Sequence, residues 1–345
     1  MRRPCGPAGP VGRVLPLLLV AALLAGCGGA ATTPPPRAAS SARPPTSSRP
    51  APSSRATVTP LPALHGPRIV IVMEENHSLD QVLGAPEAPQ VAQLAAQGTV
   101  LTQFYSTRHP SLPNYIALLS GDTFGIVTDC GGCQVDHPSL VDQLAAAHLT
   151  WRAYMQGLPA PCSAGVQAAG AYARKHDPFL YFPTVTRNPA LCDDVVPFDQ
   201  FASDAASGRL PQLVWVTPDL DHDMHGGRPG VSDAQDLAAA DQFLGQLVAE
   251  LRSSPAWQQD TRLVVTWDEG AGGQAGAHGC CGGDAVGGHI LTVVAGPRVP
   301  HGTDPTPYDH YALLRSIEGA LGLPYLGHAA DTSSHDIPAL LNPSG

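Results

Sequence analysis

Short runs of apolar, often β-branched residues alternate with amphipathic segments along the chain from residue 66 onward. A continuous apolar run predicts a strand buried on both faces, whereas apolar residues spaced three and four apart predict a helix packed on a sheet. This alternation predicts an α/β domain at residues 66–345, with a mostly parallel central sheet and helices on both faces. The predicted strands are 68–76, 99–105, 150–157, 213–221, 262–267 and 289–296, and the predicted helices are 89–97, 113–121, 139–148, 236–252 and 308–321.

Polar side chains begin abruptly where three of these strands end. Their acids and histidines are denser than an ordinary solvated loop requires. Because ligands in open α/β sheets bind beyond the carboxyl ends of the strands, we expect these side chains to form a site. They are Glu74, Glu75, Asn76 and His77 on the first strand, Asp219, Asp221, His222, Asp223 and His225 after the second, and Asp268 and Glu269 after the third.

Ser111 lies near the first turn of the helix that Gly121 is predicted to end. Unpaired N–H groups and the helix dipole favour an anion at this point, and phosphate is a suitable one. Taken alone, a serine here is an ordinary helix N-cap. Together with carboxylates and an amide it forms a set of hard oxygen ligands that suits Mg²⁺, Mn²⁺ or Ca²⁺.

The first 65 residues do not belong to the predicted domain. Two arginines precede an apolar run at 14–25, which is too short for a permanent membrane span and has the form of a secretory signal. The run ends in Leu-Ala-Gly-Cys27, which resembles a bacterial lipobox and implies cleavage before Cys27 and lipidation of that cysteine. The alternative is an ordinary signal peptide with a cysteine nearby.

We therefore expect a signal peptide at residues 1–26 and a disordered tether at 27–65, where Pro, Ala, Ser and Thr dominate. The protein would be exported and then held on the outer face of a bacterial cell membrane by its lipid, or released outside the cell. Either outcome places the folded domain in an oxidising compartment.

Charge divides the chain near the same boundary. Residues 1–73 contain eight arginines and no acid, so all 29 acidic residues lie in the remainder. An acidic domain argues against nucleic acid as a partner, because phosphate backbones are bound by clustered Lys and Arg. The chain has a single lysine, Lys175. Part of the acidity is explained if some carboxylates are metal ligands.

Cysteine usage indicates disulfides in the domain. Of eight cysteines, Cys5 leaves with the signal and Cys27 takes the lipid, so six remain. We favour Cys130–Cys133 and Cys162–Cys192, with Cys280 and Cys281 as a strained vicinal pair, while crossed pairing and a zinc site at the C-x-x-C stay open. Cys162–Cys192 would close an aperiodic insertion at 159–199 that shapes the entrance to the site.

Several motifs together resemble those of a known group, the bacterial phosphoesterase family of secreted acid phosphatases and phospholipases C within the alkaline-phosphatase-like superfamily. They follow the family order across nearly all of residues 68–328. Two positions depart from the usual pattern, because Leu79 stands where Phe is usual and Asp219 where Asn is often found. The matching segments are MEENHSLD, HPSLPNYIALLSG, TPDLDHDMHGG, WDEG, GGHI and YDHYALLRSIEGALGLPYLG.

The resemblance implies a role for each site residue. Ser111 would be the nucleophile that becomes phosphorylated, and Asn114 would hold a phosphoryl oxygen. Asn114 also occupies the position of the arginine found in related sulfatases, which argues against sulfatase activity. The implied metal ligands are Glu75, Asn76, Ser111, Asp268 and Glu269. The residues implied to contact phosphate or pass protons are His222, His225 and His289.

We expect one divalent ion, and Ca²⁺, Mg²⁺ or Mn²⁺ rather than Zn²⁺, because Glu269 stands where two-zinc relatives have histidine. The alternative is a second metal on Asp221, His225 and His289. The expected activity is that of a monomeric, metal-dependent phosphomonoesterase that acts through a phosphoserine on small or exposed phosphate esters. The alternatives are a phospholipase C and a lipoprotein that binds phosphorylated ligands without turnover.

Overall fold

The computed structural model describes residues 66–165, 167–271, 286–331 and 333–341. The signal peptide, Cys27, the tether and the pair Cys280–Cys281 lie outside these residues, so the expectations for them remain predictions. None of the described helices is long and apolar enough to cross a bilayer.

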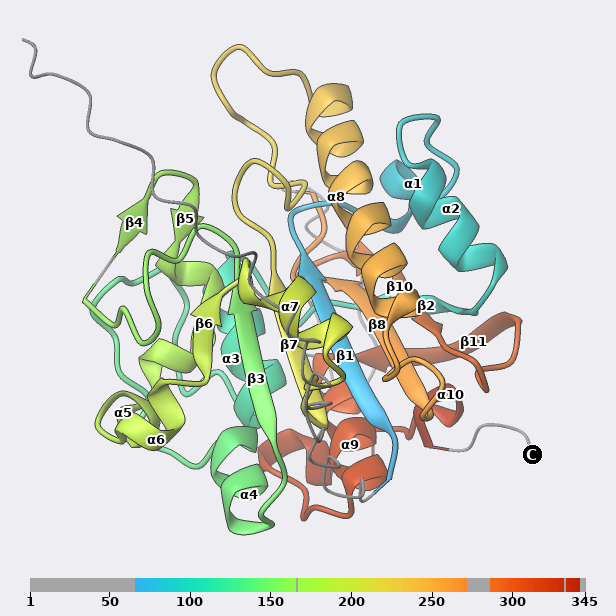
Figure 1. The fold of residues 1–345 in the computed structure, drawn as a ribbon. Coiled ribbons are helices and arrows are strands. Elements are labelled where there is room, and N and C mark those ends of the chain that lie inside the picture. The colour runs from blue at the N-terminus through green and yellow to red at the C-terminus, as the bar shows by residue number, and fades with distance from the viewer. Residues whose placement is uncertain (1–65, 166, 272–285, 332, 342–345) are drawn as a thin grey trace, which may run out of the picture. The chain divides into compact units, whose positions relative to one another are not determined.

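A nine-stranded, mostly parallel sheet forms the centre of the described fold (Figure 1). Its strand order is β11-β2-β10-β8-β1-β7-β3-β6, with β9 paired to β2. The pairs β1–β7, β1–β8, β3–β7, β3–β6 and β2–β11 are parallel, whereas β10 runs antiparallel to β2 and β8. The strands are β1 Arg68–Glu74, β2 Thr99–Tyr105, β3 Trp151–Met155, β6 Val195–Pro197, β7 Leu213–Thr217, β8 Thr261–Trp267, β9 His289–Ile290, β10 Thr292–Ala295 and β11 Gly302–Asp309.

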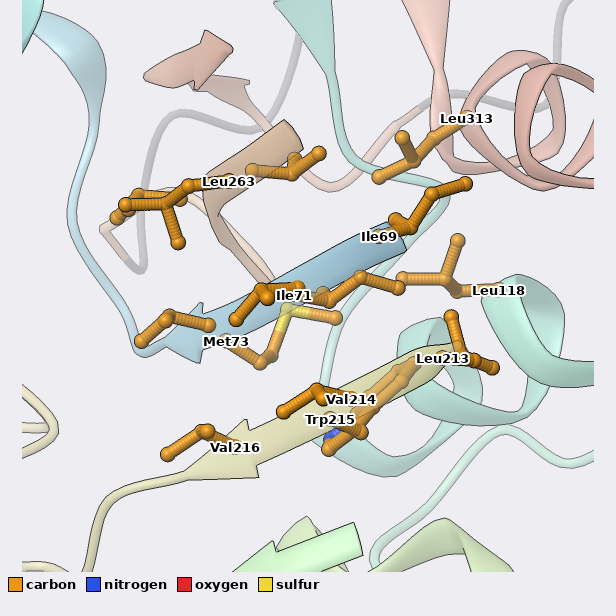
Figure 2. Close-up of a cluster of buried hydrophobic side chains, with 14 of the residues drawn as sticks. Ile69, Ile71, Met73, Leu118, Leu213, Val214, Trp215, Val216, Leu263 and Leu313 are labelled. Atoms are coloured by element: carbon orange, nitrogen blue, oxygen red, sulfur yellow. The ribbon is translucent and has the colours of Figure 1, made fainter. Parts of the chain in front are cut away.

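Strand β1 lies in the middle because it is apolar on both faces. All seven of its residues are buried, and Ile71 pairs with Trp215 of β7 on one side and Val264 of β8 on the other. In Figure 2, Leu118 and Leu313 lie at the same end of β1 as Ile69. Full burial of such a side chain contributes about 1.5–3 kcal/mol, so packing holds β1, and with it the start of the segment that follows, firmly in place.

Helices cover both faces of the sheet in two groups, and in Figure 1 α8 lies in front of the strands and α3 behind them. On one side α8 packs against α2 and α7, and on the other α3 packs against α4 and α9. The α-helices are α1 Leu79–Val82, α2 Pro89–Ala96, α3 Ser111–Ser120, α4 Leu140–Ala146, α5 Pro183–Thr186, α6 Pro189–Cys192, α7 Gln200–Ala206, α8 Asp233–Ser253, α9 His310–Leu321 and α10 Pro338–Leu341. The predicted α/β architecture is confirmed.

The aperiodic segment 159–199 is more structured than the sequence indicated. Its last residues form β6, an edge strand of the central sheet, so the interpretation of the whole segment as an insertion is wrong at that end. Three residues are too few to show periodicity. The other elements of the segment are α5, α6, the hairpin β4 Ala168–Ala169 and β5 Tyr172–Ala173, and the 3₁₀ turns η1 Arg174–His176 and η2 Pro178–Tyr181.

Two further differences concern the C-terminal part. The run predicted as one strand at 289–296 is divided into β9 and β10, and β11 was not predicted. β11 contains Pro305 and Pro307, which an edge strand tolerates because one side of its backbone needs no partner. A third 3₁₀ turn, η3, spans Gly327–Ala330.

Both disulfides within the described residues join the predicted partners. Cys130 pairs with Cys133, and Cys162 pairs with Cys192, with Cα–Cα distances of 5.6 and 5.0 Å. The second bridge ties the start of the 159–199 segment to α6. It thereby limits the positions open to the residues between them.

His310, at the start of α9, provides a test of the buried core. Its Nε2 donates to the carbonyl of Trp267 at 3.0 Å, and burial lowers the pKa of the ring to about 4. The unfolded chain binds this proton near pH 6.5, so stability should be lost as pH falls from 6.5 towards 4, by roughly 3 kcal/mol at most.

We therefore expect His310→Gln to show a smaller loss of stability than wild type between pH 7 and pH 4.5 in urea unfolding. His301→Gln, a substitution at an exposed histidine, should keep the wild-type loss. An equal loss in all three proteins would contradict a neutral, buried His310.

Candidate active site

Ser111 is the first residue of α3, and the turn before it is fixed by Asn114. The Asn114 side chain accepts a hydrogen bond from the Arg108 N–H at 2.9 Å and donates to the carbonyls of Arg108 at 2.7 Å and Pro110 at 3.2 Å. Its amide group is therefore engaged with the backbone of the turn. The implied role of Asn114 as a ligand of a phosphoryl oxygen stays a prediction.

The hydroxyl of Ser111 lies between two carboxylates from different strands. It is 3.0 Å from Oε2 of Glu75, which follows β1, and 3.2 Å from Oε1 of Glu269, which follows β8. Ser111 and both acids are buried. Sequence positions more than 150 residues apart thus meet because the two strands are parallel neighbours.

Asp268 and Asn76, two further residues expected to bind the metal, follow the ends of β8 and β1. One oxygen of Asp268 accepts the N–H groups of Asn76 at 3.1 Å and Glu269 at 2.6 Å. The other oxygen, Oδ2, is buried and has no hydrogen-bond partner. Burial, together with repulsion from Glu75 and Glu269, raises the pKa of Asp268 well above its usual range. The structure therefore places Asp268 and the backbone of Asn76 beside the acids that contact Ser111, whereas the Asn76 side chain donates to the carbonyl of His225 at 3.4 Å. The role of these five residues as metal ligands remains a prediction.

His176, in η1, is a site residue that sequence reasoning missed. Its Nε2 is 3.2 Å from Oε1 of Glu75, and its Nδ1 is 3.4 Å from Oδ2 of Asp223. Burial opposes the charged ring, but attraction to Glu75 and the interactions with Asp223 raise its pKa to about 9. For Glu75, burial alone would raise the pKa; the attraction of His176 outweighs it and lowers the pKa to about 2.

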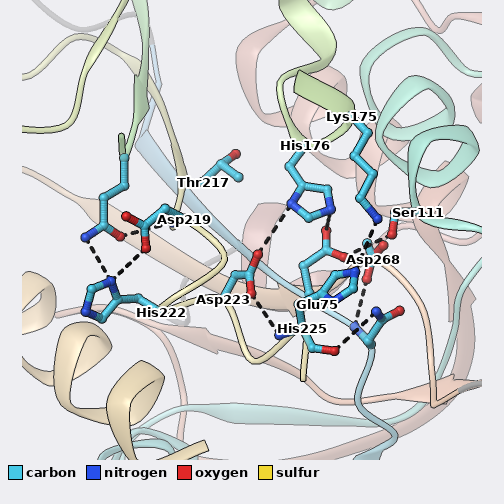
Figure 3. A network of polar contacts seen from close by, with 12 residues as sticks. Glu75, Ser111, Lys175, His176, Thr217, Asp219, His222, Asp223, His225 and Asp268 are labelled. Carbon is cyan, nitrogen blue, oxygen red and sulfur yellow. Dashed lines mark hydrogen bonds and ion pairs between the residues drawn. The ribbon is translucent and has the colours of Figure 1, made fainter. Parts of the chain in front are cut away.

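The histidines expected from the sequence lie in three different places. The ring of His225 contacts the ammonium of Lys175, with 3.2 Å between Nε2 and Nζ. His222 lies apart from Ser111 in Figure 3, where it contacts Asp219 at 2.8 Å. His289 stacks on Tyr105, and its Nε2 donates to the carbonyl of Thr102 at 2.9 Å. Direct roles for His222 and His289 on phosphate therefore remain predictions.

The residues present fit a divalent cation. Carboxylate oxygens of Glu75 and Glu269 contact the Ser111 hydroxyl, and Oδ2 of the neighbouring Asp268 is buried without a hydrogen-bond partner. Glu75 is also one of three groups whose ligand atoms lie within 4.8 Å of one another; the other two are His176 and His225. Without a cation, the negative charge of these buried acids is balanced by bound protons and by ion pairs. A cation bound here would balance that charge instead.

The groups considered for a second metal lie in different surroundings. Asp221 is exposed and pairs with Arg228, whereas His289 is directed to β2. His225 alone of this set contacts the cluster around Glu75. The number of metal ions and the identity of the metal remain predictions.

Comparison with known proteins identifies the family of this chain. A model of the Phosphoesterase family matches residues 85–324. A phosphatidylinositol-3-phosphatase of Mycobacterium tuberculosis is 34% identical over 268 residues, covering 76% of this chain and 79% of that protein. An acid phosphatase of Aspergillus fumigatus is 30% identical over 245 residues, covering 68% of this chain and 51% of the other, so the chain spans about half the length of that relative.

The fold resembles that of a solved member of the alkaline phosphatase superfamily. A solved structure of a protein in this superfamily from Vibrio parahaemolyticus has a TM-score of 0.50 at 15% identity, covering 75% of this chain and 67% of the other. The chain belongs to the Phosphoesterase family, which confirms the resemblance seen in its motifs. It is thereby a hydrolase that acts on phosphoric ester bonds.

The cation site generates a stability prediction for Asp268→Asn. In the presence of a chelator the variant should melt at a higher temperature than wild type. Its neutral amide avoids the cost of the buried Asp268 carboxyl group, which must either keep its charge among other acids or take up a proton. With saturating Mg²⁺, Mn²⁺ or Ca²⁺ the order should reverse, because only wild type gains the full binding free energy. A difference of ~1 kcal/mol would appear as roughly 2–4 °C.

Asp193→Asn, at an exposed acid, is the matched control and should follow wild type in both conditions. If no divalent ion raises the melting temperature of the wild-type protein, the cation site is wrong.

Proposed function

We propose that this protein is a metal-dependent phosphomonoesterase that acts outside the cell through a phosphoserine at Ser111. The observation that carries the proposal is the position of Ser111. This residue begins α3, and its hydroxyl contacts the carboxylates of Glu75 and Glu269. The N-terminal end of α3 favours the negative charge of a phosphate. The printed activities of the two relatives, a phosphatidylinositol-3-phosphatase and an acid phosphatase, support the same reaction class.

In the proposed reaction the Ser111 oxygen attacks phosphorus, the bond to the ester oxygen breaks, and the alcohol leaves. The two carboxylates that face the hydroxyl are within reach to accept its proton, and water supplies a proton to the leaving oxygen. Water then hydrolyses the phosphoserine and releases inorganic phosphate. Glu75, Asn76, Ser111, Asp268 and Glu269 would hold the divalent ion, which when bound lowers the pKa of the hydroxyl and balances phosphate charge.

The proposed substrates are small or exposed phosphomonoesters, including the headgroups of phosphoinositides. The mycobacterial relative, which shares 34% identity over most of both chains, supports the headgroups as candidates. A phospholipase C would instead cleave the diester on the glycerol side. Release of inorganic phosphate from p-nitrophenyl phosphate supports the phosphomonoesterase, whereas release of phosphocholine alone from phosphatidylcholine supports the alternative.

We also propose that the protein is exported and anchored through Cys27, on the basis of the sequence Leu-Ala-Gly-Cys that ends its apolar run. Membrane fractionation of cells labelled with a fatty acid tests the anchor. Wild type should carry the label in the membrane fraction, and Cys27→Ser should not. Label that persists in Cys27→Ser would contradict the assignment.

Ser111→Ala is expected to reduce kcat for p-nitrophenyl phosphate by roughly 10⁴-fold or more, because it removes the attacking oxygen. Acid quenching with a ³²P-labelled ester should trap label on the Ser111 peptide of wild type and none on the variant. Ser203→Ala, at an exposed serine of α7, should behave as wild type. Turnover that is unchanged in Ser111→Ala would show that the nucleophile is another group, and a wild-type protein that hydrolyses no phosphoester would favour the non-catalytic binder.

A further inference from the structure

The segment that carries Lys175 is anchored on both sides of that residue. Arg174 donates to the carbonyl of Leu180 at 2.6 Å, and its guanidinium lies 5.0 Å from the centre of the Tyr181 ring. His176 is buried against Glu75, as described above. Because both neighbours are fixed by buried contacts, the backbone of Lys175 has a defined position, and its side chain is directed into the site (Figure 3).

The ammonium of Lys175 is connected directly to the helix that begins with Ser111. Its Nζ lies 3.1 Å from one oxygen of Asp129, and the other oxygen of Asp129 accepts the N–H of Leu112 at 3.0 Å. A single carboxylate therefore links Lys175 to the residue next to the candidate nucleophile. The side chains of Lys175 and Asp129 are 25% and 27% exposed, so a small anion can reach them from solvent.

The negative charge around Ser111 makes the positive charge of Lys175 important for binding a phosphate. Buried carboxylates lie around Ser111, and they repel the phosphate that the proposed function requires. Arg174 is directed to Leu180 and Tyr181, and Lys175 is the only lysine of the chain. Burial opposes the charged form of Lys175, but the attraction of Glu75 and Asp129 outweighs it and raises the pKa above its usual value, so the ammonium is charged at neutral pH.

From this geometry we propose that Lys175 binds a non-bridging phosphate oxygen and sets the preference of the enzyme for phosphomonoesters over phosphodiesters. The proposal rests on the proposed function. A monoester is a dianion above its second pKa of about 6, whereas a diester carries one charge. A fixed positive charge beside the phosphate therefore stabilises the bound monoester and its transition state more than those of the diester.

The test compares two esters with the same leaving group, p-nitrophenyl phosphate and methyl p-nitrophenyl phosphate, at pH 7.5. Lys175→Met should lower kcat/KM for the monoester by about 100-fold, with a loss for the diester at least about tenfold smaller. Lys175→Arg, which keeps the charge, should retain most of the preference. Arg298→Met removes one charge at an exposed position of the chain and should leave both rates unchanged.

A second measurement does not depend on turnover. Inorganic phosphate should protect Lys175 from reductive methylation, and mass spectrometry of the peptide with this single lysine measures the modified fraction. Equal losses for both esters in Lys175→Met, or modification that phosphate does not slow, would overturn the inference. Failure of the proposed function itself would appear differently, as wild-type protein that hydrolyses neither ester, and phosphate protection would then still decide the role of Lys175.

Discussion

The structure depends on the parallel alignment of β7, β1 and β8, because this alignment concentrates negative charge in a buried place. Backbone hydrogen bonds continue past the strand ends: Glu75 N–H donates to the Asp223 carbonyl at 2.8 Å, and Asp268 N–H donates to the Glu74 carbonyl at 2.9 Å. All four of these acids are fully buried. Removing carboxylates from water is costly unless each one is protonated, paired or bound to a cation, so this group of acids needs protons or nearby positive charge.

The directions of the pKa shifts show how this charge is balanced. Burial and the neighbouring acids raise the pKa values of Glu74 and Asp268 well above their usual range. The pKa of Glu75, which faces His176, is instead lowered to about 2. The group therefore binds positive charge strongly, either as protons or as a cation. A site with this property is costly for the stability of the fold and useful for chemistry on phosphate, because a bound cation attracts the phosphate anion.

The aperiodic segment between β3 and β7 contributes positively charged side chains to the site. The hairpin β4–β5 leads directly into η1, which packs against α3 and supplies both His176 and Lys175. His176 compensates buried charge, and Lys175 extends positive charge towards solvent. Two adjacent residues thus have different environments, because one side chain packs inward on Glu75 and the other contacts the half-exposed Asp129.

Among the cysteine pairings that it left open, the sequence favoured the two disulfides found within the described residues. The sequence by itself determined the α/β fold and the acids that meet Ser111. These features follow from local patterns: apolar runs define β1, β7 and β8, and parallel neighbours place their following residues at one edge. Only the tertiary structure decided that Asn114 holds the turn before Ser111, that His222 lies apart, and that η1 completes the site. No periodicity predicts those positions, because they depend on side-chain contacts between segments that are distant in sequence, and such contacts exist only after the sheet has formed.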